Sequence, residues 1–243
     1  MTSMVPSVTQ SNILTALRTF LLGILPDGVE VIQAQDNRVP EPSVPDFVTM
    51  TPIMQTRLET NVDSYQDVSF TASIAGNTMT VSAVAFGSLA VGQTVFGVSV
   101  ADGTKIIALG SGVGGIGTYT ISQAQTVASE KMASGSKIFL QPTKIAVQLD
   151  VHGPNSADNS QMISTLFRDD FAVQAFKASG FDVTPLYVTD PRQLPFTNEN
   201  QQIENRWVID AHMQANQTIR APQQFADELH VDLIEVDAAY PAT

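Results

Sequence analysis

The sequence from Lys144 to Val173 reads KIAVQLDVHGPNSADNSQMISTLFRDDFAV, and this stretch decides the fold. Apolar and polar residues alternate in its first part, which predicts a strand with one packed face and one face exposed to solvent. The predicted packed face holds Ile145, Val147, Leu149 and Val151, and the predicted exposed face holds Ala146, Gln148, Asp150 and His152. Gly153 and Pro154 end the strand.

An amphipathic helix is predicted after this turn. Asn155 or Ser156 can cap it, because their side-chain oxygens accept hydrogen bonds from free N–H groups, and Asp158 complements the helix dipole. The apolar stripe consists of Met162, Ile163, Leu166 and Phe167. The stretch therefore predicts a strand, a tight turn and a helix packed back onto the sheet, with no catalytic pattern.

A second amphipathic helix is predicted near the N-terminus. Ser11 or Asn12 can cap it, and the run Pro26 to Gly28 ends it. Apolar residues recur at helical spacing at Ile13, Leu14, Leu17, Phe20, Leu21 and Ile24. Residues 29–35 then predict a short strand.

A proline-rich segment, DNRVPEPSVPDF, follows at residues 36–47. Pro40, Pro42 and Pro45 forbid both a regular helix and a central strand, which predicts an extended surface arm. Residues 47–60 look extended again, and Pro52 predicts an edge position or a bulge there.

The composition changes abruptly between Val68 and Ser136. This segment holds 11 of the 15 glycines and none of the 13 prolines, and its charged residues are two acidic and two basic. Short alternating runs are separated by Gly, Asn or Asp-Gly turns, which predicts a small β-sandwich or barrel. The runs are FTASIAG, TMTVSAV, QTVFGVSV, TKIIALG and TYTISQAQTVAS. Residues 68–136 are therefore interpreted as an all-β domain inserted into a body formed by residues 1–67 and 137–243.

The rest of the body is predicted to alternate strands and loops. The predicted strands cover residues 181–188, 203–217 and 231–236, a polar loop covers 189–202, and Pro222 can begin a short helix through Leu229. Trp207, Ile209, Ala211, Met213 and Ala215 share one face of the long strand. Together these elements predict an α+β body with a mainly antiparallel sheet and flanking helices.

Two patterns invite a chemical interpretation. GSGVGGIG, from Gly110 to Gly117, fits the glycine spacing of a dinucleotide-binding loop, but a strand follows it, which favours a hairpin. His152 and His212 each follow an aspartate by two residues, so a polar cluster could form if their strands are neighbours. A solvated or interfacial sheet face is the preferred interpretation. No catalytic residue, cofactor or metal is therefore predicted.

Composition narrows the possible partners. The chain has 243 residues, no cysteine and a net charge of −12, and this acidity disfavours a duplex-binding surface built on basic residues. Acidity also keeps a protein soluble, which composition alone favours as its explanation. Residues 1–25 show neither a signal peptide nor a membrane span.

Three stretches carry a resemblance to the neck or tail terminator proteins of tailed bacteriophages: DVHGPNSADNSQMISTLFRDDFAV, PLYVTDPRQLPF and RWVIDAHMQAN. The resemblance covers residues 1–66 and 137–243. It implies a structural virion protein, made in the host cytoplasm, that forms a homo-oligomeric ring of six between the head-side connector and the tail tube. Genomic DNA would pass through without specific binding. The middle segment resembles immunoglobulin-like modules inserted in phage structural proteins.

The proline arm and the polar loop are the expected intersubunit or lumenal contacts of such a ring. The candidate residues are Pro40, Pro42, Pro45, Asp190, Arg192, Phe196 and Asn198. The alternative function is a receptor- or carbohydrate-binding module carried by residues 68–136. Its aromatic residues are Phe70, Phe86, Phe96 and Tyr119. An enzyme is the least favoured class.

Overall fold

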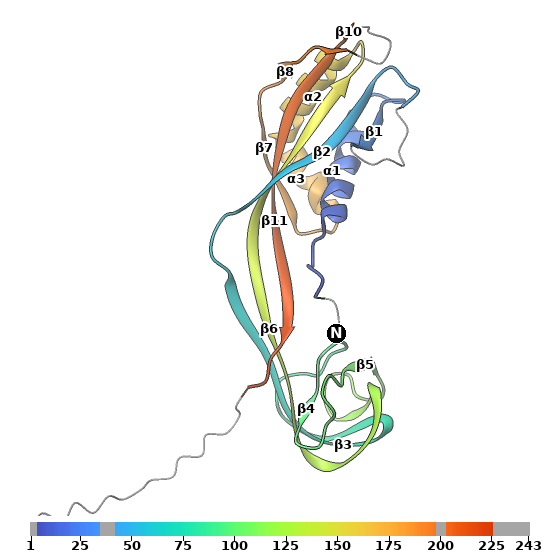
Figure 1. The fold of residues 1–243 in the computed structure, drawn as a ribbon, viewed down its shortest axis with the longest axis vertical. Helices are drawn as coiled ribbons and strands as arrows, with labels where there is room; N and C mark the ends of the chain where they lie inside the picture. The colour runs from blue at the N-terminus through green and yellow to red at the C-terminus, as the bar shows by residue number, and fades with distance from the viewer. Residues whose placement is uncertain (1–3, 35–41, 198–202, 226–243) are drawn as a thin grey trace, which may run out of the picture. The chain divides into compact units, whose positions relative to one another are not determined.

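The computed structural model describes residues 4–34, 42–197 and 203–225. These residues form three helices and eleven strands. The helices are α1 (Gln10–Ile24), α2 (Ser156–Phe167) and α3 (Asp170–Ala178). The strands are β1 (Glu30–Gln33), β2 (Phe47–Arg57), β3 (Val62–Phe86), β4 (Phe96–Gly97), β5 (Ile106–Leu109), β6 (Gly117–His152), β7 (Val183–Val188), β8 (Arg192–Gln193), β9 (Phe196–Thr197), β10 (Ile203–Glu204) and β11 (Arg206–Pro222). Figure 1 labels most of them.

The chain divides into two compact units. The helical unit comprises residues 4–64 and 138–220, and the β unit comprises residues 65–137 together with 221–225. Each unit has its own cluster of buried hydrophobic residues, and no residue belongs to both clusters. The strands β3, β6 and β11 each continue from one unit into the other.

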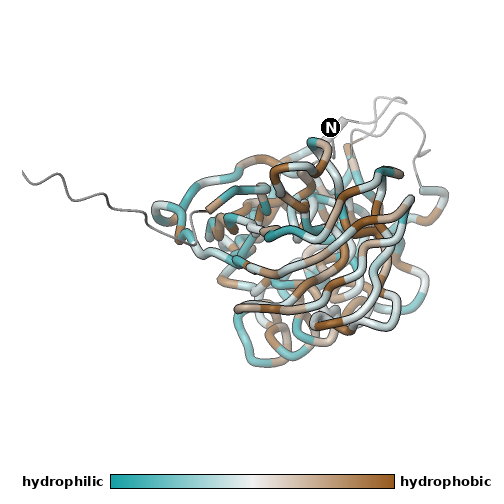
Figure 2. The backbone as a smooth tube through the Cα atoms, turned by 90° about the horizontal axis from the view of Figure 1, so that it is seen from below, coloured by the Kyte–Doolittle hydropathy of each residue, from teal (hydrophilic) through white to brown (hydrophobic). Residues whose placement is uncertain are grey.

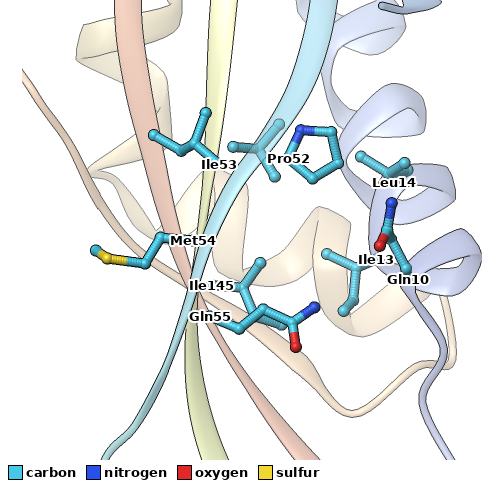
Figure 3. A pocket seen from close by; sticks show the side chains of 9 residues that line it. Gln10, Ile13, Leu14, Pro52, Ile53, Met54, Gln55 and Ile145 are labelled. Atoms are coloured by element: carbon cyan, nitrogen blue, oxygen red, sulfur yellow. The ribbon is translucent and has the colours of Figure 1, made fainter. Parts of the chain in front are cut away.

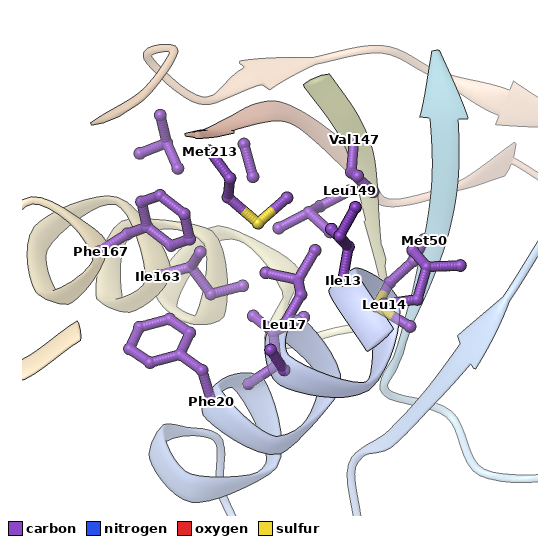
Figure 4. Close-up of a cluster of buried hydrophobic side chains, with 14 of the residues drawn as sticks. Ile13, Leu14, Leu17, Phe20, Met50, Val147, Leu149, Ile163, Phe167 and Met213 are labelled. Carbon is purple, nitrogen blue, oxygen red and sulfur yellow. The ribbon is translucent and has the colours of Figure 1, made fainter. Parts of the chain in front are cut away.

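The helical unit is built on a mixed sheet with the strand order β1-β2-β6-β11-β7. β1 and β2 are parallel, whereas β2 with β6 and β7 with β11 are antiparallel. The helices α1, α2 and α3 pack against one face of this sheet (Figures 1 and 4). This arrangement confirms the predicted α+β class.

Figure 4 shows how the core of the helical unit is filled. Leu17 and Phe20 from α1 and Phe167 from α2 point toward residues of the sheet. Phe20 contacts Phe167 edge to face, with ring centroids 5.5 Å apart. The predicted inward face of β11 is confirmed, because Ile209, Ala211, Met213 and Ala215 are all buried there.

The start of α1 differs from the prediction. Thr9 is the N-cap, and its hydroxyl accepts a hydrogen bond from the backbone N–H of Asn12 at 3.2 Å. Asn12 reciprocates by accepting from the Thr9 backbone N–H at 2.9 Å. A reciprocal pair satisfies two free donors at once. The cap prediction of Ser11 or Asn12 was therefore wrong, because the Thr9 and Asn12 pair moves the first turn toward the N-terminus.

The second face of β6 also differs from the prediction. Ala146, Asp150 and His152 are buried rather than exposed, and only Gln148 of the expected solvent face is half-buried. The cause is a set of polar and aromatic contacts with β2 and β11, which the sequence of β6 alone does not reveal. The helix after Phe167 was also missed: Asp169 caps α3 by accepting a hydrogen bond from Phe171 N at 3.0 Å.

The β unit consists largely of β3, β4, β5 and the first part of β6. Ser82 Oγ donates to the carbonyl of Thr71 at 3.2 Å, although eleven strand residues would span about 36 Å if straight. β3 therefore folds back on itself near Gly76, which has φ +63°. In the backbone coloured by hydropathy, hydrophobic residues recur at intervals along the strands (Figure 2).

The glycine-rich loop joins β5 to β6 as an antiparallel hairpin, as expected. It wraps around Tyr119, whose hydroxyl donates to Gly115 O at 2.6 Å and accepts from Gly114 N at 3.1 Å. The strand β11 extends through Pro222, so the predicted helix does not begin there. The predicted strand at 231–236 lies outside the described residues.

Candidate interaction surface

One end of the sheet brings together a buried ion pair, a buried histidine and several side-chain hydrogen bonds. There β2 begins at Phe47, β6 ends at His152, and β11 begins at Arg206. Phe47 and His152 are directly opposed, and Gly153 N donates to Asn205 O at 3.1 Å. We call this region the polar sheet end, defined by Asp46, Phe47, Asp150, His152, Gly153, Asn155, Glu204 and Arg206.

His152 is held by an aromatic stack. Its ring lies 4.5 Å from that of Phe47 at an interplanar angle of 7°, and the residue is 8% exposed. Burial is the main cause that lowers the pKa of His152, and the positive charge of Arg206 lowers it further. Asp150 and Glu204 act in the opposite direction. The balance favours the neutral imidazole in the folded protein.

The carboxylate of Asp150 is surrounded by hydrogen-bond donors from Arg206 and Gln148. Its Oδ1 accepts from Arg206 Nε at 2.8 Å and lies 2.7 Å from Arg206 Nη2. Gln148 Nε2 donates to both carboxylate oxygens, at 3.0 and 3.1 Å. A buried carboxylate is tolerated when a cation and further donors surround it. These contacts tie β6 to the first residue of β11.

The turn after β6 is fastened to the residues before β2. Gly153 adopts φ +104°, and a Cβ at this position would collide with the Pro45 carbonyl oxygen. The Asp46 carboxylate accepts from Asn155 N and from Asn155 Nδ2, both at 2.9 Å. Asn155 is the N-cap residue of α2, which confirms one of the two predicted positions. The predicted side-chain cap is wrong, because the Asn155 side chain donates to Asp46 and makes no capping hydrogen bond.

A second polar pair lies further along β11. His212 stacks on Tyr187 with ring centroids 4.4 Å apart, and Arg192 Nη2 lies 3.7 Å from Asp210 Oδ2. Burial and the charge of Lys144 lower the pKa of His212, while Asp210 opposes the shift. β6 and β11 are neighbours, so the sheet does place both Asp-His pairs on adjacent strands. Within the described ranges, no three acidic or histidine side chains are grouped as metal ligands.

The structure distributes the predicted contact residues over several places. Pro45 lies against Gly153 at the polar sheet end, and Pro42 is half-buried in the segment before β2. Asp190 is exposed and pairs with Arg168 at 3.1 Å, whereas Arg192 faces Asp210. The backbone of Phe196 lies in β9. Pro40 and Asn198 lie outside the described residues.

Four residues of the polar sheet end were missed by the sequence reasoning: Asp46, Phe47, Glu204 and Arg206. Their contribution depends on the pairing of β2 with β6 and of β11 with β6, which joins positions far apart in the chain. The sequence contains one weak indication of this region, because the charged residues Asp46, Glu204 and Arg206 lie near the predicted ends of these strands.

The aromatic residues of the β unit differ in their burial. Phe70 and Tyr119 are buried in its core, Phe96 is half-buried, and Phe86 is 44% exposed and contacts Phe225 with ring centroids 5.7 Å apart. A glycan platform requires exposed aromatic faces, and of these four residues Phe86 alone is exposed, which gives the carbohydrate-binding alternative little support. None of the helices described is long and apolar enough to cross a membrane.

Comparison with known proteins gives one family. A search of curated proteins found no match. The family model for phage neck terminator proteins matches residues 113–238. The match thus begins in the glycine-rich loop of the β unit and includes residues 113–136, which the resemblance described above leaves out, whereas it does not extend over residues 1–112. Because the matched range covers more than half of the 243 residues, the chain belongs to the phage neck terminator family.

Proposed function

We propose that this structural protein of the phage neck forms a closed ring of six identical subunits, which ends the tail tube and joins it to the head-side connector. The family match is the observation that carries the proposal. The contacts of the polar sheet end are consistent with it, because the ion pair, the aromatic stack and the hydrogen bonds of the turn fix the shape of this end of the sheet.

A closed ring requires two different surfaces on each subunit, because its interfaces are heterologous. The helical unit offers such surfaces on different parts of its sheet. The polar sheet end, together with Asp190 and with Arg192 of β8, is one, and the outer edge of β2 beyond the four residues paired with β1 is another. Pro42 and Pro45 belong to the first surface in this proposal.

The channel of the ring would let DNA pass without binding it. The chain carries 24 acidic and 12 basic residues, while residues 68–136 hold two of each, so the body alone has 22 acidic and 10 basic residues and the full net charge of −12. Phosphate groups are repelled by a surface of the same sign. We further propose that residues 68–136 form an inserted module outside the channel.

The test is an image of the protein in the virion. Cryo-electron microscopy of particles should show a symmetric ring of this chain at the head–tail junction. Its presence at fibre tips alone would contradict the proposal and favour the receptor-binding alternative. Mass photometry of the purified protein measures the number of subunits per particle in solution. A monomer is expected there if the ring assembles only on the end of the tail tube.

A further inference from the structure

A hollow of the helical unit lies between α1 and β2. It measures about 240 Å³ and is lined from α1 by Gln10, Ile13 and Leu14. Figure 3 shows these side chains on the same side of β2 as Pro52 and Gln55, whereas Ile53 and Met54 extend to the other side of the strand. Ile145 of β6 also lines the hollow. Seven of its nine lining residues are apolar, so an apolar side chain of suitable size would be stabilised there, with Gln10 and Gln55 supplying polar groups at its border.

The strand that borders this pocket has an outer edge without a partner strand in the described part of the chain. β1 pairs with Phe47 to Met50 only, while β2 continues to Arg57. A bulge at Pro52 to Met54 turns the strand at the pocket. Ile53 and Met54 are 47% and 51% exposed, which is unusual for neighbouring large apolar residues on a strand.

The sequence contains one segment that suits this edge. Residues 231–236 read VDLIEV, the predicted final strand, and they follow the last described residue, Phe225, within a run of eighteen residues. The family match extends to residue 238, so this segment is part of the family's own domain. It offers three β-branched residues and a leucine for pairing with an edge strand.

The charges of the two partners are complementary. Residues 226–243 contain five acidic residues and no lysine or arginine. The part of β2 beyond its pairing with β1, residues 51–57, and the β6 residues paired with it, 143–148, contain Arg57 and Lys144 and no acidic residue; Asp150 lies further along β6, opposite Thr49. Opposite charge does not supply most of the affinity, but it selects this edge over others.

We propose that residues 231–236 of a second copy add as a strand to the free edge of β2 and place an apolar side chain in the pocket between α1 and β2. This inference rests on the proposed homo-oligomer and names one of its contacts. Such an exchange is heterologous: each copy gives its C-terminal segment and receives another, which is the arrangement that a closed ring requires.

The natural chain lacks cysteine, so introduced cysteines can be paired without background. One full-length variant carries Ile53→Cys, and a set of six carries a single cysteine at each position from 231 to 236. When the two kinds are mixed and oxidised, we expect a disulfide-linked dimer for alternate tail positions only, because successive strand residues point to opposite faces. Val98→Cys, at a 98% exposed position of the β unit, replaces Ile53→Cys in the control mixture.

Several outcomes would overturn the inference. Dimers that form equally with Val98→Cys, or at all six tail positions alike, would show unspecific collision. Absence of any dimer, or a disulfide that forms only when both cysteines are in one chain, would exclude exchange between copies. A ring that still assembles in the virion with Leu233→Asp and Ile234→Asp would leave the proposed function standing and remove this contact from it, with Ala238→Asp and Ala239→Asp as the charge-matched control.

Discussion

At Gly153 the backbone turns from β6 toward α2 with φ +104°, beside the carbonyl oxygen of Pro45. A residue with a side chain would destabilise the fold here for two independent reasons. Its backbone would have to adopt the left-handed conformation, and its Cβ would have no space. Gly28 has a similar φ of +91° but no atom within 4 Å of an added Cβ. The two glycines therefore allow the costs to be separated.

We expect Gly28→Ala to lower the free energy of unfolding by about 1 kcal/mol, from the backbone conformation alone. Gly153→Ala should lower it by about 3 kcal/mol, because the Pro45 segment must also move. Urea denaturation of both variants measures the difference. Equal losses would mean that the Pro45 contact adds nothing to stability.

Asp150 and Arg206 form the buried ion pair of the polar sheet end, with side-chain exposures of 9% and 24%. Asp150→Asn should cost about 3 kcal/mol of unfolding free energy, because the arginine stays in place without its counter-charge. Asp190→Asn removes the partner of Arg168 in a pair that is far more exposed, and should cost less than about 1 kcal/mol. Denaturation curves of the two variants make the comparison, and similar losses would contradict the assigned burial.

The depressed pKa of His152 predicts how stability depends on pH. The unfolded histidine titrates near pH 6.5, and the folded one at lower pH, so the unfolded state binds more protons between the two values. Stability is therefore full above about pH 7 and falls as pH drops through this window. Urea denaturation at pH 7.5, 6.5 and 5.5 should show that His152→Gln reduces the fall. A protein equally stable at all three values would contradict the prediction.

At the level of elements, the sequence predicted the helices and strands that show a clear hydrophobic pattern within their own residues. The alternation in β11 and the helical spacing in α1 were sufficient, and Pro52 correctly marked a bulge in β2. The polar sheet end was not predictable, because Phe47 meets His152 across a separation of more than a hundred residues. α3 escaped because only Ala172 and Phe176 of it are buried, which leaves a short apolar pattern.

The β unit gives a prediction for the folding of the rest. The hydrophobic core of the helical unit contains no residue from 65–137, and β3 lies next to β6 where Lys137 Nζ sits 5.7 Å from the Tyr65 ring centroid. Replacing residues 68–136 by a short Gly/Ser turn should therefore leave a cooperatively folded helical unit. Circular dichroism during heating would show a single transition. An insoluble chain or a gradual melt would mean that the two cores depend on each other.

At the level of the whole molecule, charge and family lead to the same question. A net charge of −12 favours solubility wherever the acidic residues lie, but a DNA channel requires a particular placement of them. The composition alone does not choose between these explanations. A map of the assembled ring does, because it assigns each acidic side chain either to the lumen or to the outer wall.

We expect the lumen of that ring to be acidic or neutral. Lysine and arginine side chains along the path would bind phosphate groups, a binding favoured by the release of counterions, and this binding would slow the DNA. A cryo-electron microscopy map of the virion neck at side-chain resolution measures this directly. As a functional check, lysine in place of lumenal aspartates should slow DNA ejection, and the effect should fade with added salt; the same substitutions on the outer wall are the control. A lumen lined by lysine and arginine would contradict the idea, whereas acidic residues confined to the outer wall would leave solubility as their explanation.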